Sequence, residues 1–359
     1  KLMRFVETPG IGTTLIQLVD DQRKLLSRLE VLELTIWFSG VKIPVAGIAG
    51  VYTPPGLRKK GYATNCLKHA IRKQQRKDKC LLMLFGERDF YARFGLTPIG
   101  PWYGIYVSQK LAALPPEPLM RDCQALDQAQ ILNLYTQNVK PRIGAVVRDP
   151  KSLKPFFPTV WRNGGVCRVL IGSKKQFAGY VWHSAPGTSE FEVVEVGALH
   201  PAGYDGILAY LLYETKRRAK DHFLAALPPD DPFSKYLMQF EAKQVVEYKP
   251  NSRSLARILD LKKLLKLLTP VFKERVRLIK SELVPRTLMI KTGKSQAKLD
   301  LAGTYPGVEL KIEQTRLTQL LFGTVNFDLQ TSGRDGLNAE IGALLFPKFS
   351  AFTYLKDRF

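Results

Sequence analysis

The segment Ala46–Tyr52 has the composition of a strand, runs into Pro54 and Pro55, and is followed by a helical pattern that opens at Gly61. The two prolines lack backbone N–H donors, so the pairing of the strand must stop there and the sheet edge must open. Downstream of Gly61, apolar residues recur at helical spacing and basic residues occupy another face. This succession constrains the first part of the chain to an α/β or α+β arrangement.

The flanking segments support that arrangement. Thr14–Leu18 and Leu32–Phe38 are rich in β-branched and aromatic residues, and Cys80–Phe85 is typical of a buried strand. Asp89–Phe94 predicts a short helix, which Gly95 closes as its C-terminal cap. Together these segments predict a mixed sheet flanked by helices.

The turn before the first helix has the chemistry of a phosphate site. The first amides of a helix have no internal acceptor and lie at the positive end of its dipole. Gly61 lets the backbone approach a ligand, the small Ala63 does not block it, and Arg58–Lys60 add positive charge. An open strand edge after Val51 would offer backbone groups to a long arm. The pattern suits a diphosphate with such an arm, and a solvated basic loop is the alternative.

Placed between a strand and a helix, Arg58–Ala63 resembles the coenzyme A motif of the GNAT acetyltransferase superfamily. Phe90–Leu96 is similar to the tyrosine-containing helix that follows strand five in that superfamily. The resemblance implies acetyl-CoA as cosubstrate and Tyr91 as general acid. Gly86 departs from the pattern, because a coenzyme-contacting serine is usual there. The implied coenzyme contacts come from the backbone of Val51 and Thr53 and, toward the phosphates, from Arg58, Lys59, Gly61 and Ala63.

Over nearly its whole length the chain resembles the Eis-type branch of this superfamily. Val147–Pro150, Leu227–Asp231 and Asp357–Phe359 fit the pattern of that branch. The resemblance implies that the free carboxylate of Phe359 enters the active site of the first domain, and that the chain forms a homo-oligomer, a hexamer or a trimer. The implied domains are a catalytic GNAT domain (1–113), a GNAT-like domain without coenzyme (119–250) and a sterol-carrier-protein-like α/β domain (252–359).

Patterns beyond the first domain are consistent with this division. Leu114–Pro118 is proline-rich and marks a linker. Phe191–Leu199 then predicts a strand and Tyr204–Arg218 a helix, but their connection carries no Lys or Arg and contains Asp205, so it is poorly suited to hold phosphate. The last domain shows a basic amphipathic stretch, Ser254–Leu268, a strand, Val308–Ile312, and a helix, Thr315–Leu321. The aromatic closing residues, Ser350–Phe359, should be docked against the protein.

The expected function is transfer of an acetyl group from acetyl-CoA to a primary amine of an aminoglycoside, a polyamine or a lysine-like acceptor. The 54 Lys and Arg residues against 32 Asp and Glu leave a net charge of +22, which favours anionic partners and opposes a pocket for polycationic amines. A nucleic-acid-binding protein is the alternative that the charge suggests, although no known binding motif supports it. A lipid carrier is a second alternative, which rests only on the last domain.

The cysteines and histidines indicate the cellular compartment and whether a metal site is expected. The four cysteines lack paired spacing, which favours a reducing, cytoplasmic environment. Cys66 and His69 have ligand-like spacing, but no second pair lies nearby in the sequence, so we expect no metal site. No apolar stretch approaches the length of a membrane span. Since Lys1 is not an initiator Met, the true N-terminus is expected to be missing or processed.

Overall fold

The computed structural model describes residues 2–110, 119–148, 165–173, 175–248, 253–277, 279–293, 295–328, 339–354 and 357–358. The chain divides into two compact units. The first unit combines Lys1–Gly100 with Lys249–Ala351, and the second combines Pro101–Tyr248 with Phe352–Arg358. Among the described residues, no helix has the length and apolarity needed to cross a membrane.

The first unit begins with an antiparallel meander that contains no helix. Its four strands are β1 (Met3–Gly10), β2 (Thr13–Asp20), β3 (Leu25–Phe38) and β4 (Val41–Tyr52). Three further strands complete the sheet in this unit, in the order β1-β2-β3-β4-β5-β15-β6. They are β5 (Leu81–Gly86), β15 (Arg253–Ile258) and β6 (Thr97–Pro98).

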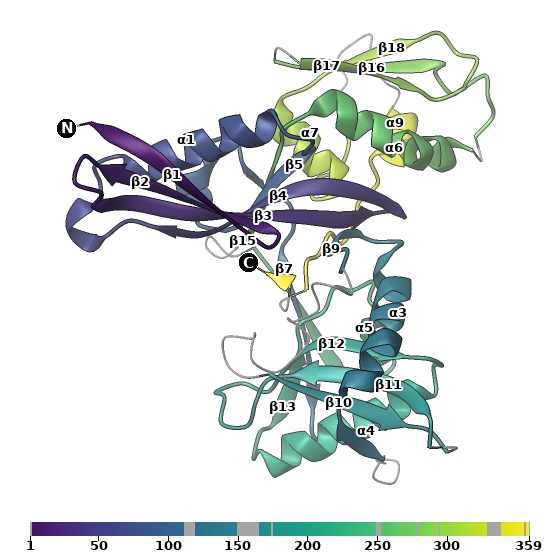
Figure 1. The fold of residues 1–359 in the computed structure, drawn as a ribbon. Coiled ribbons are helices and arrows are strands. Elements are labelled where there is room, and N and C mark those ends of the chain that lie inside the picture. The colour runs from purple at the N-terminus through teal and green to yellow at the C-terminus, as the bar shows by residue number, and fades with distance from the viewer. Residues whose placement is uncertain are drawn as a thin grey trace. The chain divides into compact units, whose positions relative to one another are not determined.

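Helix α1 (Tyr62–Gln75) covers one face of this sheet (Figure 1). Its buried residues include Leu67 and Ala70, which join a core with Ile16 and Leu29 of the meander. The basic residues on the other face of the helical pattern are exposed, as the sequence predicts. They are Lys68, Arg72 and Arg76. The expected short helix is α2 (Arg88–Ala92), and Gly95 after it has a positive φ of 75°.

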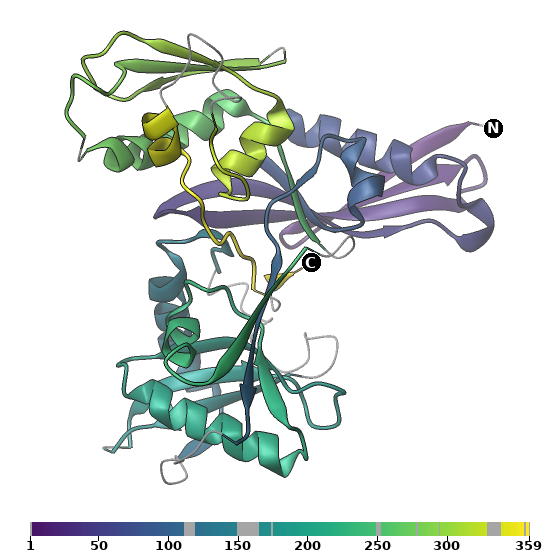
Figure 2. The same ribbon diagram turned by 180° about the vertical axis from the view of Figure 1, so that it is seen from behind.

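A helical layer separates this sheet from a second, smaller one within the same unit (Figure 2). Helix α6 (Leu261–Val276) contacts both β4 and β17, and α7 (Gln314–Leu321) packs on β15. The stretch Ser254–Leu268 is thus not one element, because it forms the end of β15 and the start of α6. The predicted strand Val308–Ile312 and helix Thr315–Leu321 are confirmed. The smaller sheet has the order β17 (Ser295–Asp300), β16 (Thr287–Thr292), β18 (Val308–Lys311), and α9 (Ala339–Leu345) packs on α6.

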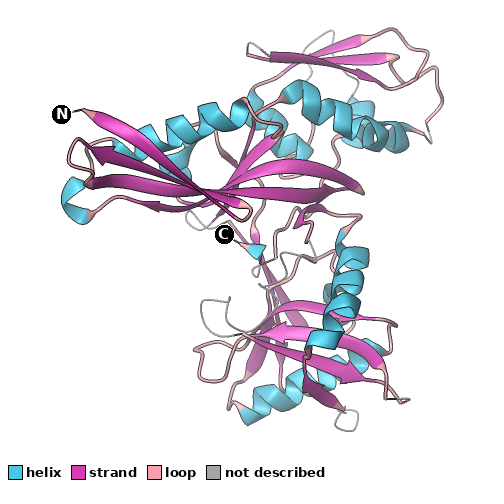
Figure 3. Cartoon of the chain, viewed as in Figure 1, coloured by secondary structure: helices cyan, strands magenta, loops and turns pink. Residues whose placement is uncertain are grey.

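The second unit has a sheet of its own, whose strands are magenta in Figure 3. Its strand order is β14-β7-β13-β12-β11-β10-β8. Strand β7 (Trp102–Ser108) pairs with β13 and β14, although the predicted division places these residues in the first domain. The three-domain division itself stays a prediction, and the linker Leu114–Pro118 lies outside the described residues. The other strands of this sheet are β8 (Met120–Asp122), β10 (Val166–Ile171), β11 (Phe177–His183), β12 (Glu192–Ala198), β13 (His222–Ala225) and β14 (Ala242–Glu247). The short strand β9 (Ile143–Val146) belongs to the same unit but not to this sheet. The α-helices described in this unit are α3 (Gln128–Val139), α4 (Gly203–Arg217) and α5 (Pro232–Leu237). Among the described residues, 3-10 turns lie at Pro55–Leu57 in the first unit and at Ala125–Asp127 in the second.

The described part of the closing segment is docked within the second unit, as expected. Tyr354 is buried, and its hydroxyl donates to the Asp231 carboxylate at 2.7 Å. Arg142 donates to the Tyr354 hydroxyl at 2.8 Å and to Asp231 at 3.0 Å. Asp357 receives two hydrogen bonds from Arg148, at 2.9 and 3.0 Å. Two arginines therefore hold the segment at Tyr354 and again at Asp357.

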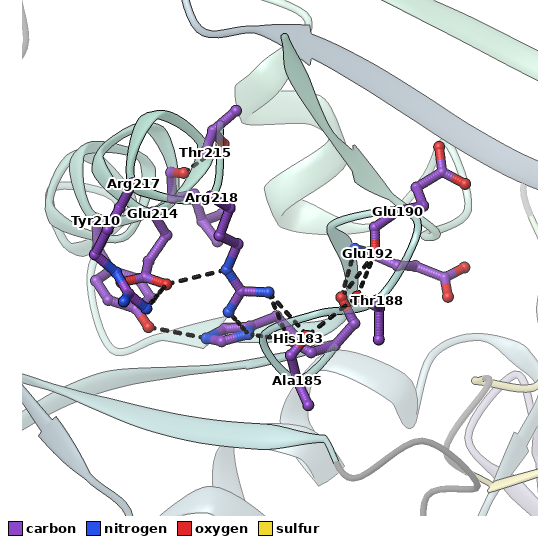
Figure 4. A network of polar contacts seen from close by, with 12 residues as sticks. His183, Ala185, Thr188, Glu190, Glu192, Tyr210, Glu214, Thr215, Arg217 and Arg218 are labelled. Carbon is purple, nitrogen blue, oxygen red and sulfur yellow. Dashed lines mark hydrogen bonds and ion pairs between the residues drawn. The ribbon is translucent and has the colours of Figure 1, made fainter. Parts of the chain in front are cut away.

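A polar network surrounds His183 in the second unit (Figure 4). Nδ1 of His183 donates to the Ser184 carbonyl at 2.9 Å, and the Tyr210 hydroxyl donates to Nε2 at 2.9 Å. Arg218 binds the Ser184 carbonyl at 2.9 Å and the Glu214 carboxylate at 3.1 Å. Burial, together with the neighbouring Arg218, lowers the pKa of His183 to about 4. The imidazole is therefore neutral in the folded protein.

Acid is expected to weaken the second unit through this histidine. The pKa of His183 falls from 6.5 in the unfolded chain to about 4 in the folded one, so its contribution is complete above pH 6.5 and is lost as the pH falls toward 4. At 1.36 kcal/mol per pKa unit, the loss is roughly 3 kcal/mol. In His183→Gln this titration is absent, so the difference in unfolding free energy between wild type and variant should shrink over that window. Denaturant unfolding measured at several pH values checks this, and a constant difference would contradict it.

Candidate active site

The parallel pairing between β4 and β5 ends early and leaves a split in the first sheet. The register runs from Val45 opposite Leu81 to Ile48 opposite Leu84 and goes no further. On its other side, β4 continues to pair with β3 as far as Tyr52. The two central strands therefore diverge at their carboxyl ends, where backbone groups of β4 no longer have β5 as a partner.

A β-bulge at Gly50 accounts for this split. The β3–β4 register shifts between the pairs Glu30–Ala49 and Arg28–Tyr52, so β4 holds one extra residue there. Gly50 lies within that shift and has a φ of 56°, which a residue with a side chain adopts only at a cost. A bulge bends its strand and increases the local twist. The split thus begins before Pro54 and Pro55. The prediction that these prolines open the sheet edge is therefore wrong.

Hydrogen bonds fix the end of β4 after the bulge. The buried Ser27 hydroxyl donates to the Tyr52 carbonyl at 2.9 Å, and the Thr53 hydroxyl donates to Ser27 at 3.0 Å. Arg58 donates from Nε to the Thr53 carbonyl at 3.3 Å. The segment Tyr52–Thr53 is therefore hydrogen-bonded to β3 through Ser27 and to the basic turn through Arg58.

The basic turn presents the free amides of the α1 N-terminus. Gly61 is the N-cap residue, with a left-handed φ of 82°, and no side chain caps the helix. Lys59 also has a left-handed φ of 61°, a conformation that costs a non-glycine residue about 1–2 kcal/mol. Uncapped helix amides carry partial positive charge, and Arg58, Lys59 and Lys60 are exposed beside them. This combination suits an anion such as a pyrophosphate.

Tyr91 lies on α2, the short helix that follows β5. It is partly buried, packs against the core of the first unit, and contacts Phe90 edge-to-face with ring centroids 4.8 Å apart. Burial raises the pKa of Tyr91, and the Glu87 carboxylate one helical turn earlier raises it further. The phenol is therefore protonated at neutral pH. Among the residues that the structure describes, none forms a hydrogen bond with the Tyr91 hydroxyl.

A cavity of about 680 Å³ joins these parts. This volume falls in the range of small-molecule and cofactor sites. All six residues expected to contact the coenzyme line it, as does Tyr91, whereas Phe359 lies outside the described residues. The cavity is lined by Val51, Tyr52, Thr53, Leu57, Arg58, Lys59, Gly61, Tyr62, Ala63, Thr64, Gly86, Glu87, Phe90, Tyr91 and Arg93.

Three of these residues, Glu87, Phe90 and Arg93, carry functional groups or an apolar surface that the sequence did not single out. Phe90 and Arg93 lie in the motif Phe90–Leu96, and Glu87 lies four residues before Tyr91, so their proximity to Tyr91 is the signal that could have found them. Arg93 stacks on Phe90, with its guanidinium 4.3 Å from the ring centroid. Among the residues that line the cavity, Glu87 supplies a carboxylate beside the basic side chains of Arg58, Lys59 and Arg93.

The Cys66 and His69 pair takes part in packing. Cys66 is buried in the core, and His69 stacks on Phe5 with a centroid distance of 3.9 Å. Nε2 of His69 also lies 2.9 Å from Glu7. Within the described ranges, no three His, Cys, Asp or Glu side chains gather in a way that could hold a metal ion.

Comparisons with known proteins bear on this geometry. Residues 4–99 match the family described as acetyltransferase (GNAT) domain. A comparison of this chain with curated proteins found no match. The fold is similar to that of a GCN5-related N-acetyltransferase from Kribbella flavida, with a TM-score of 0.69 and 19% identity over 96% of this chain and 87% of that chain.

Two further solved structures are similar over nearly the full length. A protein of unknown function from Enterococcus faecalis, described as a probable N-acyltransferase, has a TM-score of 0.70 and 17% identity over 97% of this chain and 90% of that chain. Eis1 from Mycobacterium abscessus has a TM-score of 0.64 and 14% identity over 96% of this chain and 91% of that chain. At these identities the similarity establishes the multi-domain fold.

Proposed function

We propose, from the premise that residues 4–99 make this chain a GNAT N-acetyltransferase, that the cavity beside Tyr91 binds acetyl-CoA and that the acetyl group passes to a primary amine. The observation that carries the proposal is the convergence of three features on one cavity. These are the split between β4 and β5, the uncapped N-terminus of α1, and the Tyr91 side chain.

The coenzyme would lie along the split with its pyrophosphate at α1. The amides at Gly61 and Ala63 and the charges of Arg58 and Lys59 suit the phosphates. Backbone groups of β4 at Val51, left without a β5 partner, suit the amides of the pantetheine arm. The Thr53 carbonyl already accepts a hydrogen bond from Arg58, so this arm would share that carbonyl or displace the arginine from it.

The chemistry follows from what amide formation requires. An alkyl ammonium has a pKa of about 10.4, so presenting the amine neutral at pH 7 requires about 4–5 kcal/mol. A base must remove the ammonium proton, and partial desolvation lowers its pKa. The neutral nitrogen attacks the thioester carbonyl, the C–S bond breaks, and Tyr91 donates a proton to the departing sulfur. The proton that the attacking nitrogen then loses restores the Tyr91 phenol. The products are an amide and free coenzyme A.

The finer features of the proposal rest on the Eis-type resemblance. The terminal carboxylate of Phe359 acts as the base, directly or through a water, and the C-terminal part of the chain is sterol-carrier-protein-like. The chain forms a homo-oligomer in the cytoplasm. Arg58, Lys59 and Arg93 in the cavity disfavour polycations, so an acceptor with a single amine fits better than an aminoglycoside or a polyamine.

Coenzyme binding tests the core of the proposal. Wild-type protein is expected to bind acetyl-CoA in calorimetric titration, and Arg58→Ala to bind it about tenfold more weakly, because one charged hydrogen bond contributes about 1.5–3 kcal/mol. Arg76→Ala is the matched control, since it removes an exposed charge from the far end of α1. Absence of coenzyme binding together with tight, salt-sensitive RNA binding would favour the nucleic-acid alternative.

The role of Phe359 is tested by moving its carboxylate. Adding one alanine after Phe359 is expected to lower kcat at pH 7 by about 10²-fold, the usual effect of losing a positioned base. Phe359→Leu keeps the terminal carboxylate and should retain most of the activity. Thiol release from acetyl-CoA in the presence of a panel of amines provides the measurement. If the extended protein works normally, the terminal carboxylate takes no part in the reaction.

A further inference from the structure

Gly86, the last residue of β5, lies directly against the Tyr91 ring. A Cβ atom built on Gly86 would be 2.5 Å from Cε2 and 3.1 Å from Cδ2 of Tyr91. It would also lie 3.3 Å from Cδ1 of Leu84. Heavy atoms in van der Waals contact are about 3.5–4.0 Å apart. The Tyr91 ring can therefore occupy its present position only when residue 86 has no side chain.

The surroundings of Tyr91 restrict where the ring could go instead. Its amide donates to the Glu87 carbonyl at 3.2 Å, and its carbonyl accepts from the Phe94 amide at 3.0 Å. The Phe90 ring meets it edge-to-face at an interplanar angle of 86°. Phe90 and Tyr91 also pack on the buried core of the first unit. With the helix backbone fixed at both ends, a clash at Gly86 must be relieved mainly by movement of the ring.

We infer that Gly86 is a positioning residue, which sets the place of the Tyr91 hydroxyl in the cavity by allowing the ring to lie against the end of β5. This inference rests on the proposed role of Tyr91 as general acid. A methyl group at position 86 must move the ring by about 1 Å to restore ordinary contact distances. A displacement of that size can slow a positioned reaction by about 10²-fold.

The inference also gives the glycine a reason to be there. A serine at this position, usual in the superfamily that the sequence resembles, would bring its Cβ to 2.5 Å from the Tyr91 ring as it lies in this chain. Gly86 therefore does more than lack a hydroxyl for the coenzyme. In this chain, the residue at the end of β5 and the tyrosine one helical turn into α2 form a matched pair.

A double-mutant cycle tests the inference. The variants are Gly86→Ala, Gly86→Ser, Tyr91→Phe and the double variant Gly86→Ala/Tyr91→Phe, assayed by thiol release with the most active amine of the panel. Gly86→Ala is expected to lower kcat tenfold or more and to leave the KM for acetyl-CoA within about twofold of wild type. In the Tyr91→Phe background the same change should have little further effect on kcat, because the two residues act through one hydroxyl. Gly86→Ser should behave like Gly86→Ala.

A stability cycle covers the case in which Gly86→Ala folds poorly. In Tyr91→Ala, the space beside Gly86 is open, so the loss in Tm caused by Gly86→Ala should be much smaller there than in wild type. This measurement needs no acceptor and reports on the contact itself.

The possible outcomes separate the two proposals. Wild-type kcat in Gly86→Ala overturns the positioning role, and so does an equal loss of kcat in both backgrounds or an equal loss of Tm in both. In each case, a slow Tyr91→Phe leaves the general-acid role intact. Wild-type kcat in Tyr91→Phe removes that role and the inference with it.

Discussion

Tyr91→Phe is expected to lower kcat for acetyl transfer by about 10²- to 10⁴-fold, the range observed for the loss of a general acid. The substitution removes only the hydroxyl, so the ring can keep its contacts with Gly86 and Phe90. Affinity for acetyl-CoA and thermal stability should therefore stay close to those of wild type. Initial rates of thiol release, together with calorimetric titration of the coenzyme, separate the loss of chemistry from a loss of binding.

Tyr213→Phe serves as the control, because Tyr213 is an exposed tyrosine of α4 in the second unit. Its kcat should equal that of wild type. A rate for Tyr91→Phe within threefold of wild type would show that the departing sulfur needs no proton from this side chain.

Arg148→Met is expected to cost the second unit about 3–5 kcal/mol of unfolding free energy, as is usual when one partner of a buried ion pair is removed. Arg148 donates to both oxygens of Glu195, at 2.9 and 2.5 Å, and to both oxygens of Asp357. Its side chain is 6% exposed and that of Glu195 is 1% exposed. Methionine fills much of the volume but removes the positive charge and the hydrogen bonds that Arg148 gives to the two carboxylates. Guanidinium chloride unfolding followed by fluorescence measures the loss.

Two companion variants make this result specific. Arg217→Met removes an arginine that is 51% exposed from its pair with Glu214, and it should cost no more than about 1 kcal/mol. Adding Glu195→Gln to Arg148→Met should recover part of the loss, because the buried side chain at position 195 is then neutral. A loss for Arg148→Met no larger than that for Arg217→Met would mean that this network contributes little.

The local parts of the site could be predicted from the sequence. The helix that begins at Gly61, the short helix that carries Tyr91, and the strands on either side are encoded within a few residues of one another. The place where the sheet splits could not be located in this way. Gly47 and Gly50 look alike in the sequence, and only the register with β3 shows which of them forms the bulge.

Pairings between distant segments were also missed. Residues 254–258 appear as the start of a basic amphipathic stretch, yet they form a strand between β5 and β6. Similarly, Trp102–Ser108 follows the first domain in sequence but pairs with strands of the second unit. Period and composition report on a segment alone, whereas the choice of a sheet partner depends on surfaces that the rest of the chain supplies.

The insertion of β15 between β5 and β6 has a consequence for how the protein is made. The sheet that carries the cavity lacks an internal strand until residue 258 has left the ribosome. At translation rates of about 5–20 residues per second, β5 waits on the order of 10–30 s for this neighbour. During that interval the nascent chain has an exposed strand edge. A fragment that ends at residue 113 would keep that edge permanently, and it should aggregate when it is expressed alone.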